Sequence, residues 1–336
     1  MDGYVPGEQP QAGKFIKLNT NENPYPPSPA VAAAIGRAAQ SGLQRYPDPL
    51  ATAFRLRAAE VLGVDPEWIL CGNGSDEILT MLTRALVGEG QWLRFPTPSY
   101  LLYQTLADLQ GARAEQVAFA SNWHLSESFF RTQKDLRLVL LPNPNSPSGT
   151  LVDGDTILRL ADRLDCPVLV DEAYVDFAAR DCLDLVKQDP RVMVCRTLSK
   201  SYALAGLRFG FLVAQPAVIA GLRKVKDSYN CDALSIAGAT AAIDDQAWRE
   251  ENRAKILATR THLTSELRRL GYQVTESAAN FVWCWRDDRS EHQIYRQLKE
   301  QRVLVRYMKY PDWGEGLRIS VGTDEQIAVC LQLLSE

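Results

Sequence analysis

A polar segment near the middle of the chain, residues 196–210, contains side chains that could do chemistry together. Lys200 follows an apolar, strand-like run, and a lysine at a strand end can be partly desolvated, which lowers its pKa and frees its amine to attack an aldehyde or ketone. Arg208 offers a planar fork of donors that suits phosphate, and Thr197 and Ser199 add hydroxyl donors. A lone lysine in a polar loop would usually be an ordinary surface residue. Together, these groups indicate a ligand that needs an amine, a phosphate clamp and hydroxyl donors, which is pyridoxal phosphate held as a Schiff base.

An acidic residue ends the preceding apolar run. Asp171 closes the strand-like stretch that begins at Pro167, and a carboxylate there is costly to bury without a partner. A protonated pyridine nitrogen would be such a partner, and Tyr174 could donate to the ring hydroxyl of the same ligand. Taken alone, Asp171 would more simply be a capping residue. Because ligands bind where parallel strands end at one edge of a sheet, Asp171 followed by Lys200 at the next strand end is a much more specific pair.

A strand–turn–helix segment earlier in the chain could hold the phosphate. A short strand stops at a Gly-x-Gly turn that ends at Gly74, and a helix begins after Ser75 and Asp76. Helix N-termini bind phosphate through free N–H groups and the helix dipole. Gly-x-Gly alone would usually be a plain turn, but with Arg208 and Ser199 as further donors the three residues are predicted to form the phosphate cup. The charge of Asp76 is unfavourable near phosphate, so its alternative role is that of N-terminal helix cap.

The chain of 336 residues exceeds the usual size of one hydrophobic core, so two domains are expected. The fold class is predicted to be α/β, with a large α/β/α domain around a mostly parallel sheet, because strands such as residues 136–141 are nearly continuous apolar runs. The smaller domain would be α+β with a largely antiparallel sheet. The Pro-, Gly- and Asn-rich start predicts an extended arm rather than a packed element, and composition alone is equally compatible with a disordered linker. The predicted boundaries are 1–30 for this arm, 31–244 for the large cofactor-binding domain and 245–336 for the small domain.

Several segments carry apolar residues at helical spacing. Ser28 followed by Pro29 is a typical helix start, and this helix is expected to continue through Ala39. One long amphipathic helix is predicted from Trp248 to Leu270. The other predicted helices cover residues 50–62, 153–164, 216–226, 235–244 and 291–301.

The composition excludes several classes of protein. The net charge is −4 without a basic run, which argues against nucleic-acid binding, and no apolar segment has membrane-spanning length. The first residues lack the charged and apolar regions of a signal peptide. The seven cysteines are scattered and contain no Cys-x-x-Cys, which argues against a disulfide framework or a metal site. We therefore expect buried thiols in the reducing cytoplasm.

The stretch TLSKSYALAGLRFG, residues 197–210, resembles the lysine signature of fold type I pyridoxal-phosphate enzymes, whose fold is that of aspartate aminotransferase. Within that superfamily the chain most resembles the histidinol-phosphate aminotransferase family, from about Tyr4 to its C-terminus. The resemblance implies transfer of an amino group between histidinol phosphate and 2-oxoglutarate, giving imidazole-acetol phosphate and glutamate in histidine biosynthesis. Lys200 would be the catalytic base and acid, and Asp171 would keep the cofactor ring cationic.

The resemblance also assigns roles to residues in the first hundred. Asn21, Glu22 and Asn23 match the family's Asn-Glu-Asn-Pro segment, which lies at the substrate pocket, so the N-terminal arm would be a lid. Tyr46 matches a tyrosine that reaches the cofactor phosphate of the neighbouring subunit, which implies a homodimer with shared active sites. Tyr100 matches an aromatic residue that stacks on the pyridine face. By residue type alone, Tyr46 would be a surface aromatic and Tyr100 a core residue.

Three further assignments come from residues beyond the first hundred. The family usually has Asn-Pro-x-Gly, whose Asn contacts the ring hydroxyl, but here Ser146 precedes Pro147 and Asn145 comes one residue earlier. We assign the contact to Asn145, with Ser146 as the alternative. Arg318 matches the arginine that binds the α-carboxylate of glutamate, although an arginine on a strand is ordinarily just exposed. Arg306 matches a further arginine that meets the substrate phosphate.

Three other functions are compatible with this sequence. A threonine-phosphate decarboxylase has the same cofactor-binding residues and a phosphorylated substrate, and an aromatic amino-acid aminotransferase would use a similar pocket. An inactive binding protein on the same fold is the alternative from another class. The presence of Asp171, Tyr174, Lys200 and Arg208 together argues against an inactive protein.

Overall fold

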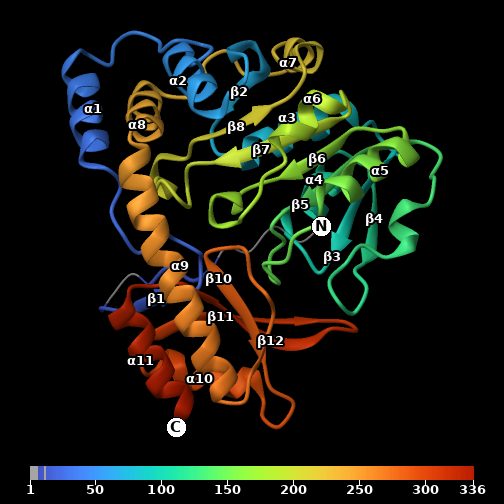
Figure 1. Ribbon diagram of the computed structural model, residues 1–336. Coiled ribbons are helices and arrows are strands. Elements are labelled where there is room, and N and C mark those ends of the chain that lie inside the picture. The colour runs from blue at the N-terminus through green and yellow to red at the C-terminus, as the bar shows by residue number, and fades with distance from the viewer. Residues whose placement is uncertain (1–6, 11–12) are drawn as a thin grey trace.

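The computed structural model describes residues 7–10 and 13–336 of the chain. Its described elements form two sheets with helices packed against each, a seven-stranded one in the upper part of the molecule and a five-stranded one in the lower part (Figure 1). The upper part is an α/β/α sandwich and the lower part is a smaller α+β domain. The predicted fold class is therefore confirmed.

The large sheet is mostly parallel. Its order is β2-β8-β7-β6-β5-β3-β4, and within this order only β8 runs antiparallel to its neighbours. The central strands are buried on both faces, which explains their continuous apolar runs. The strands are β2 (Ile69–Gly72), β3 (Trp92–Thr97), β4 (Arg113–Ala118), β5 (Leu136–Pro142), β6 (Val168–Asp171), β7 (Val192–Thr197) and β8 (Gly210–Val213).

Two hydrophobic cores lie on opposite faces of this sheet. One is shared with α3 (Ser75–Leu86), α4 (Leu102–Leu109) and α7 (Pro216–Leu222). The other is shared with α2 (Thr52–Leu62), α5 (Gly154–Leu164), α6 (Leu183–Gln188) and α8 (Ala233–Asp244), and α1 (Pro29–Gln40) packs on α8. Short 3-10 helices cover Pro66–Trp68, Glu127–Phe130, Val175–Phe177 and Ala205–Leu207.

The small sheet contains a strand from the N-terminal arm. Its order is β1-β11-β12-β10-β9, with β1 (Ile16–Leu18) parallel to β11 and the other pairs antiparallel. The expectation that the whole arm is unpacked is therefore wrong for these residues, because Leu18 is fully buried in the small-domain core. The remaining elements are β9 (Gln273–Val274), β10 (Phe281–Trp285), β11 (Val303–Tyr310), β12 (Gly314–Ser320), α10 (Glu291–Glu300) and α11 (Asp324–Ser335).

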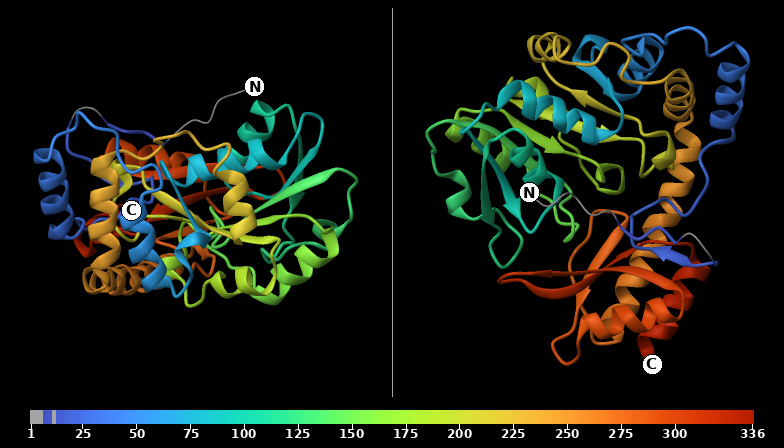
Figure 2. Two further views of the ribbon diagram at one scale, coloured as in Figure 1. Left: turned by 90° about the horizontal axis from the view of Figure 1, so that it is seen from above. Right: turned by 180° about the vertical axis from the view of Figure 1, so that it is seen from behind.

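The long helix α9 (Gln246–Arg269) connects the two domains, and Figure 1 and the right-hand view of Figure 2 both show it running from the upper part into the lower part. It begins close to the predicted position, where the side chain of Asp245 accepts a hydrogen bond from the Trp248 N–H. The helix predicted over residues 216–226 ends earlier, at Leu222. The exact domain boundaries stay a prediction.

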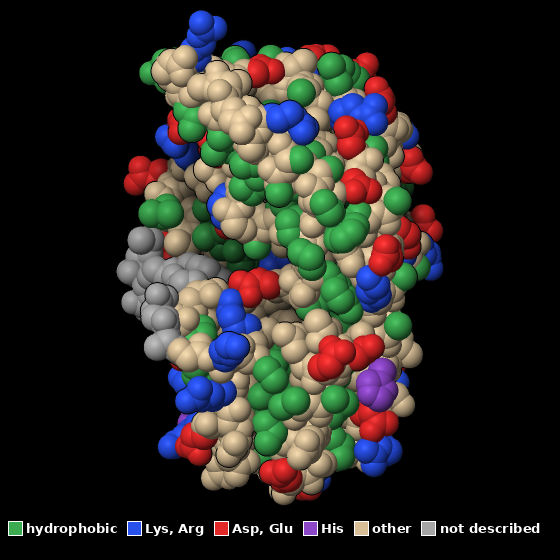
Figure 3. Space-filling model, turned by 90° about the vertical axis from the view of Figure 1, so that its left-hand side faces the viewer, with side chains coloured by type: hydrophobic (Ala, Val, Ile, Leu, Met, Phe, Trp, Pro, Cys, Tyr) green, Lys and Arg blue, Asp and Glu red, His purple; other side chains and the backbone are tan. Residues whose placement is uncertain are grey.

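The surface carries side chains of mixed type, whereas the cysteines lie in the interior. Hydrophobic and charged side chains are intermixed on the face shown in Figure 3. All seven cysteines are free thiols and all are buried, as predicted. Within the described part of the chain, none of the helices combines the length and the apolar character that crossing a bilayer requires.

Candidate active site

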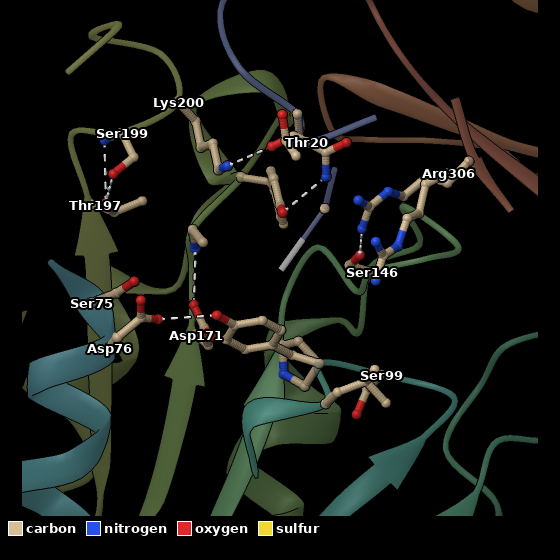
Figure 4. A pocket seen from close by; sticks show the side chains of 18 of the residues that line it. Thr20, Ser75, Asp76, Ser99, Ser146, Asp171, Thr197, Ser199, Lys200 and Arg306 are labelled. Atoms are coloured by element: carbon tan, nitrogen blue, oxygen red, sulfur yellow. Dashed lines mark hydrogen bonds between the residues drawn. The ribbon is translucent and has the colours of Figure 1, made fainter. Parts of the chain in front are cut away.

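A cavity of about 280 Å³ lies where the large domain, the small domain and the N-terminal arm meet. Its floor is at the C-terminal ends of β6 and β7, where ligands bind in open α/β sheets. Figure 4 shows Lys200, Ser199 and Thr197 on one side, Arg306 on the opposite side and Asp171 below and between them. Most of the predicted site residues line this one space.

Lys200 presents its amine inside the cavity. Its Nζ donates to the backbone carbonyl of Thr20 at 3.2 Å and lies 5.6 Å from the centre of the Tyr174 ring. The backbone carbonyls of Lys200 and Ser201 accept hydrogen bonds from Asn23 Nδ2 at 3.0 and 3.1 Å. The arm therefore holds both the side chain and the turn of the lysine, although Asn23 itself does not line the cavity.

Asp171 ends β6 as predicted and is only 6% exposed. Its Oδ2 accepts a hydrogen bond from the Tyr103 hydroxyl at 2.8 Å, and its Oδ1 accepts one from the Ala173 N–H at 3.2 Å. Burial raises the pKa of this carboxyl to about 6. A buried acid of this kind on a cavity floor suits a ligand with a cationic group.

Tyr103 was missed by the sequence interpretation. It lies on α4, three residues after Tyr100, which precedes the helix, and a tyrosine at an apolar helix position is ordinarily a core residue. The spacing of the two tyrosines was the only available signal. It indicates that the two rings could lie close together but does not show which polar group the second hydroxyl meets.

The predicted phosphate-binding residues converge. An Nη of Arg208 donates to Ser199 Oγ at 3.3 Å, and Thr197 Oγ1 is 2.9 Å from the same Oγ. Gly74, at the start of α3, has a φ of +80°, and a Cβ there would lie 2.7 Å from the Arg208 guanidinium. The backbone at Gly74 is therefore close to the guanidinium only because the residue is glycine. Ser75 lines the cavity beside it.

The capping role considered for Asp76 is wrong. Gly74 occupies the N-cap position of α3 without a side-chain cap, and Asp76 lies within the first turn. The Asp76 carboxylate accepts hydrogen bonds from the Tyr100 hydroxyl at 3.1 Å and from Arg208 at 3.0 Å. A positive guanidinium thus offsets the charge that seemed unfavourable at this position. Tyr100 lines the cavity and is oriented by this bond.

Asn21 connects the arm to Tyr174. Its Nδ2 donates to the Tyr174 hydroxyl at 3.0 Å, and both line the cavity. The Asn21 N–H donates to Ser320 Oγ at 2.8 Å, and the Asn21 carbonyl accepts from Asn280 Nδ2 at 3.0 Å. Asn280 and Ser320 are two positioning residues that the sequence interpretation did not include, because their contact with the arm joins opposite ends of the chain.

Of the neighbouring residues Asn145 and Ser146, Ser146 is the one that lines the cavity. Asn145 is buried outside the cavity lining, and its Nδ2 donates to Ser148 Oγ at 2.9 Å and to the Pro98 carbonyl at 3.2 Å. Ser146 lines the cavity, and its Oγ accepts a hydrogen bond from Arg318 at 2.8 Å. The amide of Asn145 thus holds the surrounding loops, and Ser146 is the one of the two that faces the cavity.

Two arginines form the small-domain side of the cavity. Arg306 on β11 and Arg318 on β12 are opposite each other in the strand register, and both line the cavity. Arg318 also donates to the Asn19 carbonyl at 3.0 Å, and its guanidinium lies 5.4 Å from the centre of the Phe281 ring. Two neighbouring guanidinium groups favour an anionic substrate.

Tyr46 is a predicted site residue that does not line the cavity of its own chain. Its side chain is 79% exposed, and its ring stacks on Tyr229 at 4.4 Å between centroids. Its role in the cavity of the neighbouring subunit stays a prediction.

Comparison with known proteins agrees with this site. Residues 13–334 match the family described as aminotransferase class I and II. The chain is 60% identical to a histidinol-phosphate aminotransferase of Rhodopirellula baltica, over 99% of this chain and 92% of that protein. It is 45% identical to histidinol-phosphate aminotransferase 1 of Trichormus variabilis, over 100% of this chain and 96% of that protein.

Solved structures give the same result. The crystal structure of histidinol-phosphate aminotransferase from Sinorhizobium meliloti, in complex with pyridoxal-5'-phosphate, matches with a TM-score of 0.87 and 26% identity. The match covers 96% of this chain and 90% of that one. The chain therefore belongs to the class I and II aminotransferase family and, within it, to the histidinol-phosphate aminotransferases.

Proposed function

We propose that this protein is a pyridoxal-phosphate-dependent aminotransferase that converts histidinol phosphate and 2-oxoglutarate into imidazole-acetol phosphate and glutamate, in histidine biosynthesis. The observation that carries the proposal is that one cavity is lined by an amine, a buried carboxylate and a guanidinium, from Lys200, Asp171 and Arg208. The substrate is inferred from the names of relatives that match this chain over its full length.

The residues present fit pyridoxal phosphate. Asp171, whose carboxyl is buried and has a raised pKa, suits the ring nitrogen. The N-terminus of α3 together with Arg208 and Ser199 suits the phosphate. Ser146 and Tyr174 would face the ring hydroxyl, and Lys200 would hold the aldehyde carbon. When bound, this cofactor supplies an electron sink for the substrate carbon that loses its proton.

Lys200 would move the proton. As a base, its Nζ would take the proton from the carbon that carries the substrate amine. As an acid, the same Nζ would then give this proton up again. The hydrogen bonds from Asn23 to the carbonyls of Lys200 and Ser201 hold the turn from which this side chain extends. Asn21 orients the Tyr174 hydroxyl, so both arm residues are proposed to act on the site.

The two arginines of the small domain would select the substrates. Arg318 would bind the α-carboxylate of glutamate, for which its planar fork is suited. Arg306 would bind the phosphate of histidinol phosphate. Arg318 is supported from both sides, because it donates to Ser146 of the large domain and to Asn19 of the arm.

We further propose a homodimer whose cavities are completed by Tyr46 of the partner copy. Two other exposed apolar side chains lie near Tyr46. Tyr229 stacks on it and is 46% exposed, and Leu43, three residues earlier in the chain, is 59% exposed. Burying them against a second copy would remove apolar surface from water. The cytoplasmic location stays a prediction from the sequence.

A substrate panel tests the reaction. Purified protein loaded with pyridoxal phosphate is incubated with 2-oxoglutarate and either histidinol phosphate, phenylalanine or tyrosine, and glutamate is measured. In parallel, CO2 is measured with O-phosphothreonine. We expect glutamate to form with the highest kcat/KM from histidinol phosphate. Release of CO2 without any formation of glutamate would instead identify a decarboxylase, and a preference for the aromatic amino acids would change the substrate.

A further inference from the structure

We propose that Tyr103 is a positioning residue of this active site, whose hydroxyl holds the Asp171 carboxylate ionised and oriented toward the ring nitrogen of the cofactor. The inference rests on the proposed function, because it assumes that Asp171 meets the ring of pyridoxal phosphate. It adds a residue that does not line the cavity and acts only through Asp171.

The geometry fixes the carboxylate at both oxygens. The Tyr103 hydroxyl donates to Oδ2 at 2.8 Å, and the Ala173 N–H donates to Oδ1 at 3.2 Å. Two donors on two oxygens determine the plane of the carboxyl group. Among the described residues, no other side chain donates a hydrogen bond to Asp171. The backbone donor belongs to the strand end itself, so Tyr103 is the side chain that sets the orientation.

Tyr103 is held rigidly in place. Its side chain is fully buried on α4, and its ring packs edge-on against Phe95 at 5.7 Å and against Tyr100 at 5.6 Å between centroids. Aromatic contacts of this kind fix the ring plane. The hydroxyl therefore has one direction, and in that direction it meets the Asp171 carboxylate.

The surroundings make Tyr103 the donor of this bond. Burial and the nearby Asp171 charge raise the pKa of the Tyr103 hydroxyl well above 10, so it keeps its proton. The Cys195 thiol on β7 also keeps its proton, because burial raises its pKa. The Asp76 carboxylate on α3 disfavours a charge on Asp171, whereas the Tyr103 bond favours one.

Four cationic side chains line the same cavity, and Lys200 and Arg208 are the two that belong to the large domain. Neither one forms a hydrogen bond with Asp171 among the contacts described. The Tyr103 hydroxyl is therefore the nearest group that stabilises the ionised carboxylate before a ring cation arrives.

Tyr103→Phe tests this role, because it removes the donor and keeps the ring. The dissociation constant of pyridoxal phosphate for the cofactor-free protein is measured by absorbance between pH 5 and 8.5. In the wild type, affinity is expected to fall as Asp171 gains its proton near pH 6. Without the donor, this inflection is expected to move upward by about one unit, since a hydrogen bond to a charged group is worth that much. Between the two inflections the variant should bind about tenfold more weakly.

Two controls separate this role from packing. Tyr272→Phe removes another buried hydroxyl, one in the small domain without a hydrogen-bond partner in the described structure, and should leave the binding curve unchanged. In an Asp171→Asn background, Tyr103→Phe should have no further effect on the curve. Circular dichroism and the unfolding midpoint confirm that each variant folds.

Three outcomes are distinguishable. Coincident curves for the wild type and Tyr103→Phe would overturn the inference and leave the proposed function intact. An equal loss of affinity in the Asp171→Asn background would also overturn it, because the tyrosine would then act through packing. A wild-type protein that does not bind pyridoxal phosphate at all would overturn the proposed function and, with it, this inference.

Discussion

Two hydrogen bonds hold Lys200. Its amine donates to the carbonyl of Thr20, and its backbone carbonyl accepts from Asn23. Replacing it by Ala should remove the amine without disturbing the turn, because Asn23 contacts only backbone oxygens there. We expect Lys200→Ala to lose turnover by several orders of magnitude and to retain pyridoxal phosphate non-covalently. Steady-state assays measure the loss of turnover. Gel filtration in buffer without denaturant measures whether the cofactor is released, as expected for non-covalent binding. Substantial turnover in this variant would contradict the role assigned to Lys200.

Arg208 has a different proposed role from Lys200, because it would bind the cofactor phosphate. It donates to Ser199 and Asp76 and borders the backbone of Gly74, so it would supply charge-assisted hydrogen bonds to the phosphate. Such bonds are each worth about 1.5–3 kcal/mol, which is about 10- to 100-fold in affinity. Arg208→Ala should weaken binding of pyridoxal phosphate by this factor in equilibrium titrations. Arg84→Ala, at the exposed far end of α3, is the matched control and should change nothing.

At the scale of elements, the start of α3 is positioned by its contact with β8. A Cβ on Gly210 would lie 2.6 Å from the Ser75 nitrogen and 2.7 Å from the Gly74 carbonyl carbon, and neither backbone atom can move cheaply. Gly210→Ala should therefore cost about 1–3 kcal/mol in unfolding free energy and also weaken cofactor binding. Gly36→Ala, in the interior of α1 with open space around it, should instead stabilise by about 0.5–1 kcal/mol. Urea titrations measure the unfolding free energy of both variants. Equal effects of the two substitutions would contradict a close approach between Gly210 and the backbone of Gly74 and Ser75.

The N-terminus of α10 contains another buried acid, Glu291. Glu291 is fully buried, its Oε1 accepts from the Arg286 N–H at 2.8 Å, and burial raises the pKa of its carboxyl from 4.5 to about 7. The folded protein thus keeps this proton up to about pH 7, whereas the unfolded chain loses it near 4.5. Stability is therefore lost as pH rises through this window, by at most ~3 kcal/mol.

Glu291→Gln should remove this part of the pH dependence. Relative to the wild type, the variant should be more stable at pH 8 and little changed at pH 4.5, as measured by urea unfolding at both pH values. Glu300→Gln, at the exposed C-terminal end of the same helix, should keep the wild-type pH profile. An unchanged pH profile in Glu291→Gln would show that this carboxyl is ionised in the folded protein.

At the scale of the whole molecule, the site requires three parts of one chain and, as we propose, a tyrosine from a second chain. A hybrid dimer tests this sharply. Combining a Tyr46→Ala chain with a Lys200→Ala chain should give one cavity that has both Lys200 and Tyr46, and thus the wild-type affinity for pyridoxal phosphate in half of the cavities. If Tyr46 served its own chain, every cavity in the purified hybrid would lack one of the two residues, and no cavity would regain both activity and affinity.

The sequence by itself determined the residues whose role follows from local order along the chain. Asp171 and Lys200 follow apolar runs, and such runs become adjacent parallel strands whose ends meet at one edge. The glycine turn and the helix behind it likewise follow from neighbouring residues. For the same reason, the α/β class and most helices were predictable from hydrophobic periodicity.

Only the tertiary structure decided which side chain among neighbours turns into the cavity and which distant groups meet. Ser146 rather than Asn145 faces the site because the amide of Asn145 is bonded to Ser148 and to the loop after β3. Tyr103 bonds to Asp171 because α4 packs into the core on one face of the sheet, which brings the Tyr103 hydroxyl to the end of β6. Residues 16–18 join the small sheet by pairing with a strand near the other end of the chain. These contacts arise from packing between segments remote in sequence, and local periodicity contains no information about such partners.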